Sequence, residues 1–259
     1  MRADETRVRA WCIEHVRDGM CAIYMRARHL LHPLCVALPF ALHVSVVMAQ
    51  VHTIDWAGMK WRVRTEQGGP CATQRWNADG VWVDAAGQLH LKLIRMPSGV
   101  LSCAEIISLE QFRFGTYQFE VTGPIGTIDA NVALGIFFYP SPDVGPDGTN
   151  EIDIEVARWG RPDGPQVHYT AWYRSRPGSW HLPMRVADQA NHAQFGIQWL
   201  PGSVRWTSSL QGATEAHFEG DVASQPQTLR FNLWLFRQPA PVDGREVEFV
   251  IKSMKVREW

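Results

Sequence analysis

The fold is decided by the stretch Asn150-Glu-Ile-Asp-Ile-Glu-Val156. Successive side chains of a β-strand point to opposite faces of the sheet, so Glu151, Asp153 and Glu155 share one face and the apolar residues between them share the other. This alternation predicts a strand whose apolar face lies in a core. Three carboxylates spaced two residues apart repel one another, so selection for stability alone does not explain the acidic face.

Three interpretations of the acidic face are open: a solvent-exposed acidic surface, a calcium site, and a catalytic pair of carboxyl groups. The apolar strands around Ile152-Asp-Ile154 favour a central strand over an exposed one. Glycoside hydrolysis needs one ionised carboxylate, to attack or to activate water, and one carboxyl that holds a proton for the leaving oxygen. The acidic face offers both groups, although the local sequence does not say which glutamate has which role.

The spacing of the two glutamates bears on the type of reaction. Glu151 and Glu155 have backbones about 13 Å apart, at about 3.3 Å per residue. If their side chains lean together on a concave strand, the carboxyl groups approach to roughly 5–7 Å, nearer the separation in retaining than in inverting glycosidases. Asp153 lies between them, where it can hydrogen-bond one glutamate and hold a proton on its neighbour by repulsion.

The chain after residue 50 shows no long helical periodicity. Short β-rich segments recur between Gly, Pro, Asn and Asp residues, which is typical of a sandwich or barrel. Many strands without helices predict an all-β fold of two packed antiparallel sheets. Strands are expected at 81–83, 89–94, 116–122, 131–139, 151–157, 166–173, 193–199, 203–209, 228–236 and 246–256.

The first 49 residues do not resemble the rest. A basic start at Met25, a mostly apolar stretch over 30–47 and a small residue at Ala49 predict a secretory signal peptide at 25–49. A core helix or a membrane anchor is the alternative, and Pro33 and Pro39 argue against both. The protein is therefore expected to be secreted or periplasmic, with no membrane contact after cleavage.

The remaining chain, residues 50–259, is expected to be one domain and a monomer, preceded by a mis-assigned extension at 1–24. Without residues 1–49, which carry six Arg and four acidic residues, the chain has 19 basic and 22 acidic side chains. A net charge near −3 argues against nucleic acid or an anionic membrane as a partner. It suits a neutral or weakly charged ligand.

Cysteine and tryptophan give weaker signals. Cys71 and Cys103 remain after the predicted cleavage, and a disulfide and two buried free thiols are equally compatible with them. Eleven of the twelve tryptophans lie beyond residue 50. Most are expected in the core, with about two to four in contact with a ligand, since a flat indole matches the C–H face of a sugar ring.

The acidic strand resembles the Glu-x-Asp-x-Glu signature of glycoside hydrolase family 16, whose members have a concanavalin A-like lectin/glucanase jelly roll. Its uninterrupted spacing looks like the lichenase and transglycosylase branches, whereas laminarinase-type members carry a bulged spacing. The resemblance implies that Glu151 is the nucleophile, that Asp153 assists, and that Glu155 is the acid/base.

The resemblance extends over roughly residues 75–256. The segments Cys103–Ser108 and Phe114–Glu120 look like the part of the family that supplies a substrate-binding glutamate, here Glu105, although Ile107 stands where an arginine is expected. Segments 195–199 and 204–206 resemble paired strands of the convex sheet. With Trp172 added, the substrate-binding residues implied by these similarities are Glu105, Phe137, Tyr139, Trp172, Asn232 and Trp234.

The sequence therefore predicts a retaining, endo-acting β-glycoside hydrolase or transglycosylase with a polysaccharide substrate. No organic cofactor is expected; a structural Ca²⁺ on the convex sheet is compatible with the resemblance, but no dense set of carboxylate ligands stands out. One alternative is a glycan-binding module of the same fold without catalysis, and another is a structural adhesion domain. Intact Glu151 and Glu155 argue against both, because binding alone needs no pair of carboxyls with different ionisation.

Export is expected to remove the residues up to Ala49. Intact-mass measurement of the exported protein should give an N-terminus at Gln50 or within a few residues of it. Retention of residues 25–49 would contradict the prediction of a signal peptide.

Overall fold

A computed structural model describes residues 51–211 and 214–259. The predicted extension at 1–24 and the signal peptide at 25–49 lie outside the described residues. Within the described residues, the only helical element is a single 3-10 turn, η1 (Ala78–Gly80). No helix in this part of the chain is long and apolar enough to cross a membrane.

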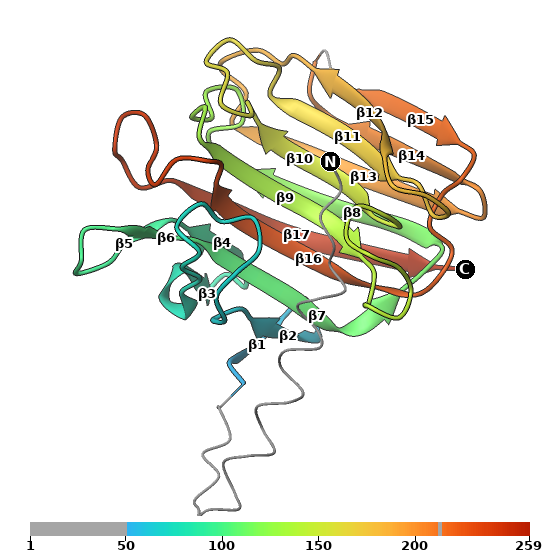
Figure 1. The fold of residues 1–259 in the computed structure, drawn as a ribbon, viewed down its shortest axis with the longest axis horizontal. Coiled ribbons are helices and arrows are strands. Elements are labelled where there is room, and N and C mark those ends of the chain that lie inside the picture. Colours follow the sequence, from blue (N-terminus) through green and yellow to red (C-terminus); the bar gives the residue numbers. More distant parts are fainter. Residues whose placement is uncertain (1–50, 212–213) are drawn as a thin grey trace, which may run out of the picture. The chain divides into compact units, whose positions relative to one another are not determined.

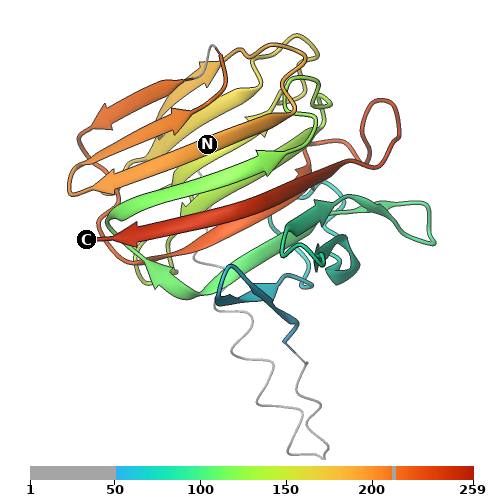
Figure 2. The ribbon, with the colours of Figure 1, turned by 180° about the vertical axis from the view of Figure 1, so that it is seen from behind.

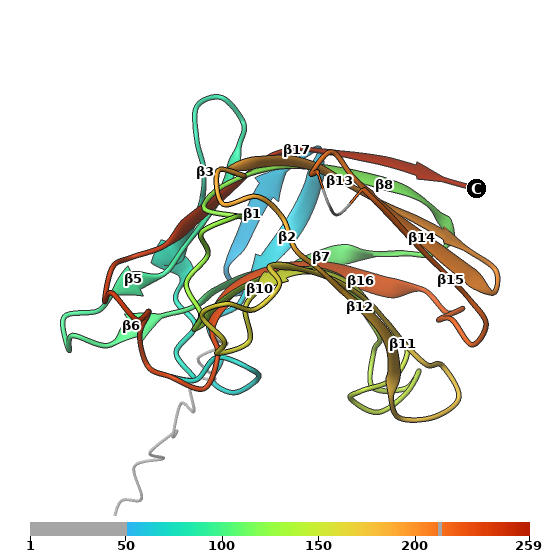
Figure 3. The same cartoon turned by 90° about the horizontal axis from the view of Figure 1, so that it is seen from above.

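Two antiparallel sheets pack face to face, which confirms the all-β jelly-roll sandwich (Figures 1 and 3). The eight-stranded sheet has the order β1 (Thr53–Trp56), β2 (Met59–Val63), β7 (Ala104–Phe112), β16 (Gln227–Leu235), β9 (Val132–Tyr139), β10 (Ile152–Ala157), β11 (Val167–Trp172) and β12 (Ser179–Met184).

The seven-stranded sheet, which faces the viewer in Figure 2, forms the second layer. Its order is β15 (Glu215–Glu219), β14 (Ser203–Ser208), β13 (His192–Leu200), β8 (Gly115–Thr122), β17 (Glu248–Glu258), β4 (Leu89–Lys92) and β3 (Val81–Val83). A separate short hairpin joins β5 (Ile94–Arg95) and β6 (Leu101–Ser102). The expected pairing of the strands at 195–199 and 204–206 is confirmed, as β13 and β14 are antiparallel neighbours here.

The core lies between the two sheets. Ile152, Ile154 and Val156 of β10 are fully buried in it, as the alternation of the acidic stretch predicts. From the other sheet, residues such as Tyr117 and Phe119 of β8 meet them in the same cluster. At about 1.5–3 kcal/mol for each fully buried large apolar side chain, this face fixes which way β10 is turned. The acidic residues of β10 consequently lie on the outer face of the eight-stranded sheet, which curves away from the second layer in Figure 3.

Several strands were not predicted. The hairpin of β1 and β2 turns at Ala57 and Gly58, both at positive φ. Alanine seldom adopts this backbone conformation, so sequence rules do not predict a turn there. The edge strand β12 alternates between half-buried and exposed side chains, but it contains Pro183, and a proline argues against a strand in sequence rules. The nine-residue strand β7 was missed because its register with β16 shifts at a bulge, which breaks the period of two.

Cys71 and Cys103 form a disulfide, which settles the pairing that the sequence left open. The bond joins the loop before η1 to the start of β7, over a sequence separation of 32 residues. Closing a loop of that length stabilises the folded state by roughly 3–4 kcal/mol on the chain-entropy model. The same loop carries Gly69 and Pro70 to the outer face of the eight-stranded sheet.

Candidate active site

A groove of about 590 Å³ lies on the outer face of the eight-stranded sheet. Its walls and floor come from five neighbouring strands, β7, β16, β9, β10 and β11, and from loops at their ends. It is lined by Arg64, Gly69, Pro70, Glu105, Gly135, Phe137, Tyr139, Asp147, Gly148, Glu151, Asp153, Glu155, Trp159, Trp172, Arg230, Asn232 and Trp234. All nine residues predicted from the sequence to form the site are therefore brought together in one groove.

The pairing of β10 places its acidic residues in the middle of this sheet. Asp153 is opposite Phe137 on β9 and Thr170 on β11, and Glu155 is opposite Gly135 and His168. Neither pairing shows a register shift, so the uninterrupted spacing expected from the sequence is confirmed. With a period of two and no bulge, all three carboxyls stay on the groove side of the strand.

The acidic face is not a solvated surface. Asp153 is only 2% exposed, and its Oδ2 accepts a hydrogen bond of 2.9 Å from Trp172 Nε1. No N–H or O–H donor from the described residues reaches Asp153 Oδ1. The side chain of Glu151 is close enough for the two carboxyls to shift each other's pKa.

The three carboxyls differ in how readily they ionise. Burial raises the pKa of Glu155 to about 8, and the charge of Glu151 adds to the effect. Burial also raises the pKa of Glu151 to about 7, but the hydrogen bond from Asp153 and the charge of Arg230 oppose it. Asp153 has a pKa well above its usual range because of burial and the charges of Glu151 and Glu155. The two glutamates thus differ in surroundings, because the effects of Asp153 and Arg230 oppose the raised pKa of Glu151, whereas burial and the charge of Glu151 both raise the pKa of Glu155.

Glu105 lies on β7 at the other side of the groove floor. Its Oε2 accepts a hydrogen bond of 2.8 Å from Arg64, and Arg230 approaches its Oε1 at 3.7 Å. Burial raises the pKa of Glu105, and the charge of Arg64 opposes that effect. Ile107 stands where the family resemblance led us to expect an arginine, but the structure supplies two arginines to Glu105 from β16 and from the loop after β2.

The other predicted substrate contacts have different surroundings. The Tyr139 hydroxyl donates to Asp147, and the guanidinium of Arg230 lies 4.2 Å from the Tyr139 ring centre, so one face of that ring is covered. Trp172 is tied to Asp153 and holds a carboxyl in place. Trp234 lines the groove but also packs partly against the core. It lies on β16, so that β9 separates it from the acidic strand.

Four features of the groove were not predicted from the sequence: Arg64, Trp159, Arg230 and the role of Gly135. A Cβ at Gly135 would lie 2.5 Å from Asn232 Oδ1, so the glycine makes room for that amide beside Glu155. A glycine inside a predicted strand is a signal for such a close approach and was available. Trp159 directly follows the acidic strand and contacts Trp234 at 5.8 Å between ring centres. No local sequence pattern marks Arg64 or Arg230 as a residue of the site.

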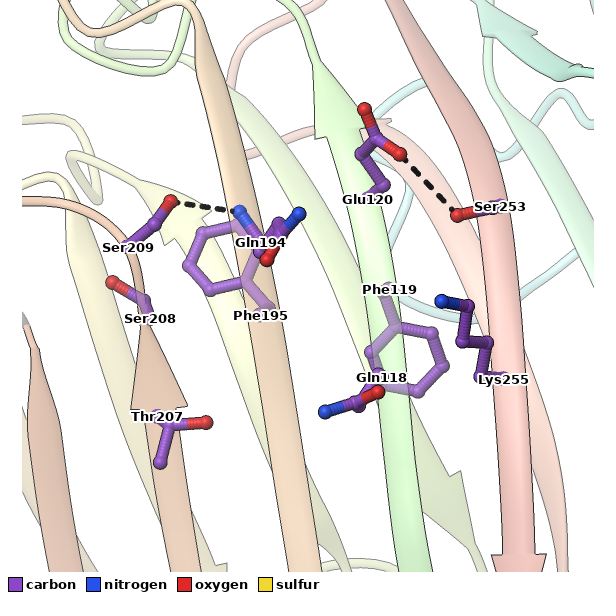
Figure 4. Close-up of a pocket in the computed structure, with 10 residues that line it drawn as sticks. All are labelled: Gln118, Phe119, Glu120, Gln194, Phe195, Thr207, Ser208, Ser209, Ser253 and Lys255. Atoms are coloured by element: carbon purple, nitrogen blue, oxygen red, sulfur yellow. Dashed lines mark hydrogen bonds between the residues drawn. The ribbon is translucent and has the colours of Figure 1, made fainter.

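A second depression, of about 320 Å³, lies on the outer face of the seven-stranded sheet (Figure 4). The aromatic side chains among its lining residues, Phe119 and Phe195, are both buried in the core. Its polar groups partly satisfy one another, since Ser209 accepts from the Gln194 backbone and Ser253 donates to Glu120. Neither a carboxyl pair nor an exposed aromatic ring occurs among the residues that line it.

No group of three or more His, Cys, Asp or Glu side chains among residues 51–211 and 214–259 is arranged to hold a metal ion. The structural calcium expected from the resemblance stays a prediction.

The ionisation of Glu155 is expected to make stability fall as pH rises. A buried carboxyl with a raised pKa binds its proton more tightly in the folded than in the unfolded chain, so the free energy of unfolding drops between about pH 4.5 and about pH 8. In Glu155→Gln, the fall in the free energy of unfolding from pH 5 to pH 9 should be smaller than in the wild type by on the order of 3 kcal/mol. Urea unfolding at the two pH values measures it. Glu219→Gln, an exposed control on β15, should keep the wild-type dependence. If the free energy of unfolding falls equally from pH 5 to pH 9 in the wild type and in both variants, Glu155 is not a buried carboxyl of raised pKa.

Comparison with known proteins agrees with this geometry. No family model matches the sequence. A β-glucanase of Fibrobacter succinogenes is 28% identical over 142 residues, which cover 51% of this chain and 38% of that protein. This chain spans less than two thirds of the length of the curated relatives that it matches.

Solved structures share the fold. A β-glucanase of Bacillus licheniformis superposes with a TM-score of 0.60 at 18% identity, over 77% of this chain and 92% of that one. A glycoside hydrolase family 16 endo-glucanase of Bacteroides ovatus superposes with a TM-score of 0.60 at 16% identity, over 76% of this chain and 94% of that one. The chain shares its fold with these solved structures and is similar in sequence to β-glucanases.

Proposed function

We propose that this protein is a retaining, endo-acting β-glycoside hydrolase or transglycosylase that cleaves a polysaccharide. The observation that carries the proposal is the placement of Glu151, Asp153 and Glu155 together in the groove, on a strand paired on both sides without a register shift. A pair of carboxyls, one ionised and one protonated, is what retaining glycosidases use. A module that only binds glycans has no use for this difference.

In the first step, the Glu151 carboxylate attacks the anomeric carbon as the glycosidic C–O bond breaks. Glu155 donates its proton to the departing oxygen, and Glu151 becomes an ester of the sugar. In the second step, Glu155 takes a proton from water or from an acceptor hydroxyl, whose oxygen attacks the same carbon. The ester bond breaks, and Glu151 returns as a carboxylate. Asp153, held by Trp172, lies next to Glu151 on the same face and assists it.

The proposed substrate is a β-glucan, because the similar proteins named above are β-glucanases. The groove crosses five strands, about 19 Å at about 4.8 Å between neighbouring strands, which is longer than one sugar ring and supports action within a chain. A neutral glucan also agrees with the small net charge. Secretion and a monomeric state belong to the same proposal and rest on the sequence.

Azide should distinguish the two glutamates on an activated aryl glycoside. In Glu155→Ala, a good leaving group still allows Glu151 to be glycosylated, and azide entering the vacated space should attack the intermediate and give the β-glycosyl azide. In Glu151→Ala, the covalent route is lost, so azide should attack from the empty side and give the α-azide. The proton coupling constants of the products tell the anomers apart.

Swapped anomers would reverse the two roles. Near-normal polysaccharide turnover by both variants would remove the acidic strand from the mechanism. An absence of turnover by the wild-type protein on β-1,3-, mixed-linkage, algal and chitinous glycans, together with measurable binding to one of them, would favour the glycan-binding module.

Trp234 is expected to bind sugar rather than to stabilise the fold. Trp234→Ala should lower kcat/KM about tenfold, which corresponds to about 1.4 kcal/mol, and should change the melting temperature little. The matched control is Trp82→Ala, a partly exposed indole on β3 of the other sheet, which should leave kcat/KM unchanged. A loss of about 3–5 kcal/mol in Trp234→Ala would instead mark it as a core residue.

A further inference from the structure

A turn of unusual backbone conformation follows the acidic strand. Trp159 has a φ of 52° and Gly160 a φ of 76°, and a bulky side chain rarely adopts this left-handed conformation. Such a backbone persists only where its surroundings hold it, and it is concentrated at functional sites. Trp159 also lines the groove, so its conformation calls for a reason in the site.

Neighbouring groups hold this turn on both sides of Trp159. The Arg158 Nε donates to the Ile128 carbonyl at 3.0 Å. The Gly160 N–H donates to the Ala130 carbonyl at 2.8 Å. These hydrogen bonds do not involve the indole, so the turn directs the ring of Trp159 without depending on it.

The register of the strands shows what lies next to Glu155 on the groove face. Glu155 is opposite Gly135 on β9. Two residues further along, on the same face of each strand, Ala157 is opposite Ala133. Both alanines are on the groove side of the sheet, yet both are buried. Larger side chains therefore close over this row.

Two indoles meet at the row of alanines. Trp234 on β16 is opposite Ala133. Trp159 follows Ala157 by two residues in the chain. The ring centres of Trp159 and Trp234 are 5.8 Å apart, and their planes are inclined by 54°. The two rings thus form an aromatic corner at the Glu155 end of the acidic strand.

The aromatic corner has ring surface left for a ligand, since both indoles are only half-buried. Phe236 and His168 also touch Trp159, but at 78° and 69°, so neither ring is stacked on it. Among the described residues, no group accepts a hydrogen bond from the Trp159 indole N–H. Trp82 differs, because its ring stacks on His90 at 14°.

We propose that Trp159 binds the sugar that departs when the chain is cut, as one wall of the aromatic corner. This inference rests on the proposed function and deepens it. The two carboxyls of a retaining glycosidase flank the bond that breaks, so attack by Glu151 expels the leaving oxygen on the side of Glu155. The sugar attached to that oxygen lies toward the aromatic corner.

The chemistry of the aromatic corner fits a neutral pyranose. A flat indole matches the C–H face of the sugar ring, and the second indole, inclined by 54°, bounds the same ring from the side. The free indole N–H of Trp159 can donate to a sugar hydroxyl, which is an acceptor. An acceptor sugar that replaces the departed one occupies the same place in transglycosylation.

The test compares substrates that share their donor sugars and differ in the leaving group. Oligosaccharides of β-1,3- and mixed-linkage β-glucan have a leaving sugar, whereas the β-glycosyl fluorides of the same donor parts have none. Trp159→Ala should lower kcat/KM on the oligosaccharides about tenfold and leave it unchanged on the fluorides. The matched control Trp82→Ala should leave both values unchanged.

An equal loss on both kinds of substrate would overturn the proposal and make Trp159 a support of the carboxyls or of the donor sugars. No loss on either would show that Trp159 does not touch the substrate. Trp159→Gly is a second variant in case Trp159→Ala does not fold, because glycine adopts a positive φ without strain.

A second measurement separates this inference from the proposed function. Indole ¹⁵N–¹H NMR of Glu155→Gln, titrated with the same oligosaccharides, reports binding without cleavage, and adding Trp159→Ala assigns the signal. The Trp159 signal should shift, and the Trp82 signal should not. An unshifted Trp159 signal with an active wild-type enzyme would overturn the role of Trp159 alone. A shifted signal with an inactive wild-type enzyme would overturn the function and leave the sugar site standing, and neither activity nor shift would overturn both.

Discussion

The burial of three carboxyls on one strand is the constraint on which the site depends. Taking a carboxylate out of water is costly, so buried acids either find partners or keep their protons. Here both happen. Asp153 accepts a hydrogen bond from Trp172, whereas no cation is among the groups that most affect the pKa of Glu155, which burial raises to about 8. The difference in ionisation that the proposed chemistry needs is thus a consequence of where each carboxyl is placed.

The opposite face of the same strand makes this burial tolerable. Ile152, Ile154 and Val156 anchor β10 in the sandwich core, and β9 and β11 hold it by regular pairing on both sides. A one-residue slip of the register would exchange the two faces and put three acids into the core. The strong amphipathic alternation therefore specifies the register, and it keeps the carboxyls fixed while their charges change.

Much of this arrangement could be read from the sequence because it depends on a period of two. That period locates β10 and, with the family resemblance, brings Glu105, Asn232 and Trp234 to the same groove. Arg64 and Arg230 could not be found that way, since each acts on a partner far along the chain and neither belongs to a local pattern. The sequence likewise could not decide between a disulfide and two free thiols, because the path of the loop between Cys71 and Cys103 determines whether they meet. The edge strand β12 was missed because it is short and contains a proline, although its half-buried and exposed side chains alternate.

The position of Ile107 shows why a missing motif residue is a weak argument against a site. The resemblance led us to expect an arginine there, on the same strand as Glu105. Instead, the cations come from β16 and from the loop after β2 and reach the same carboxylate through space. Electrostatic stabilisation depends on distance and burial, and not on which strand carries the charge. Moving a cation to β16 also has a consequence that an arginine at 107 would not have, because from there it lies over Tyr139 and acts on Glu151 as well. The charge on β16 therefore affects the pKa of Glu151 as well as that of Glu105.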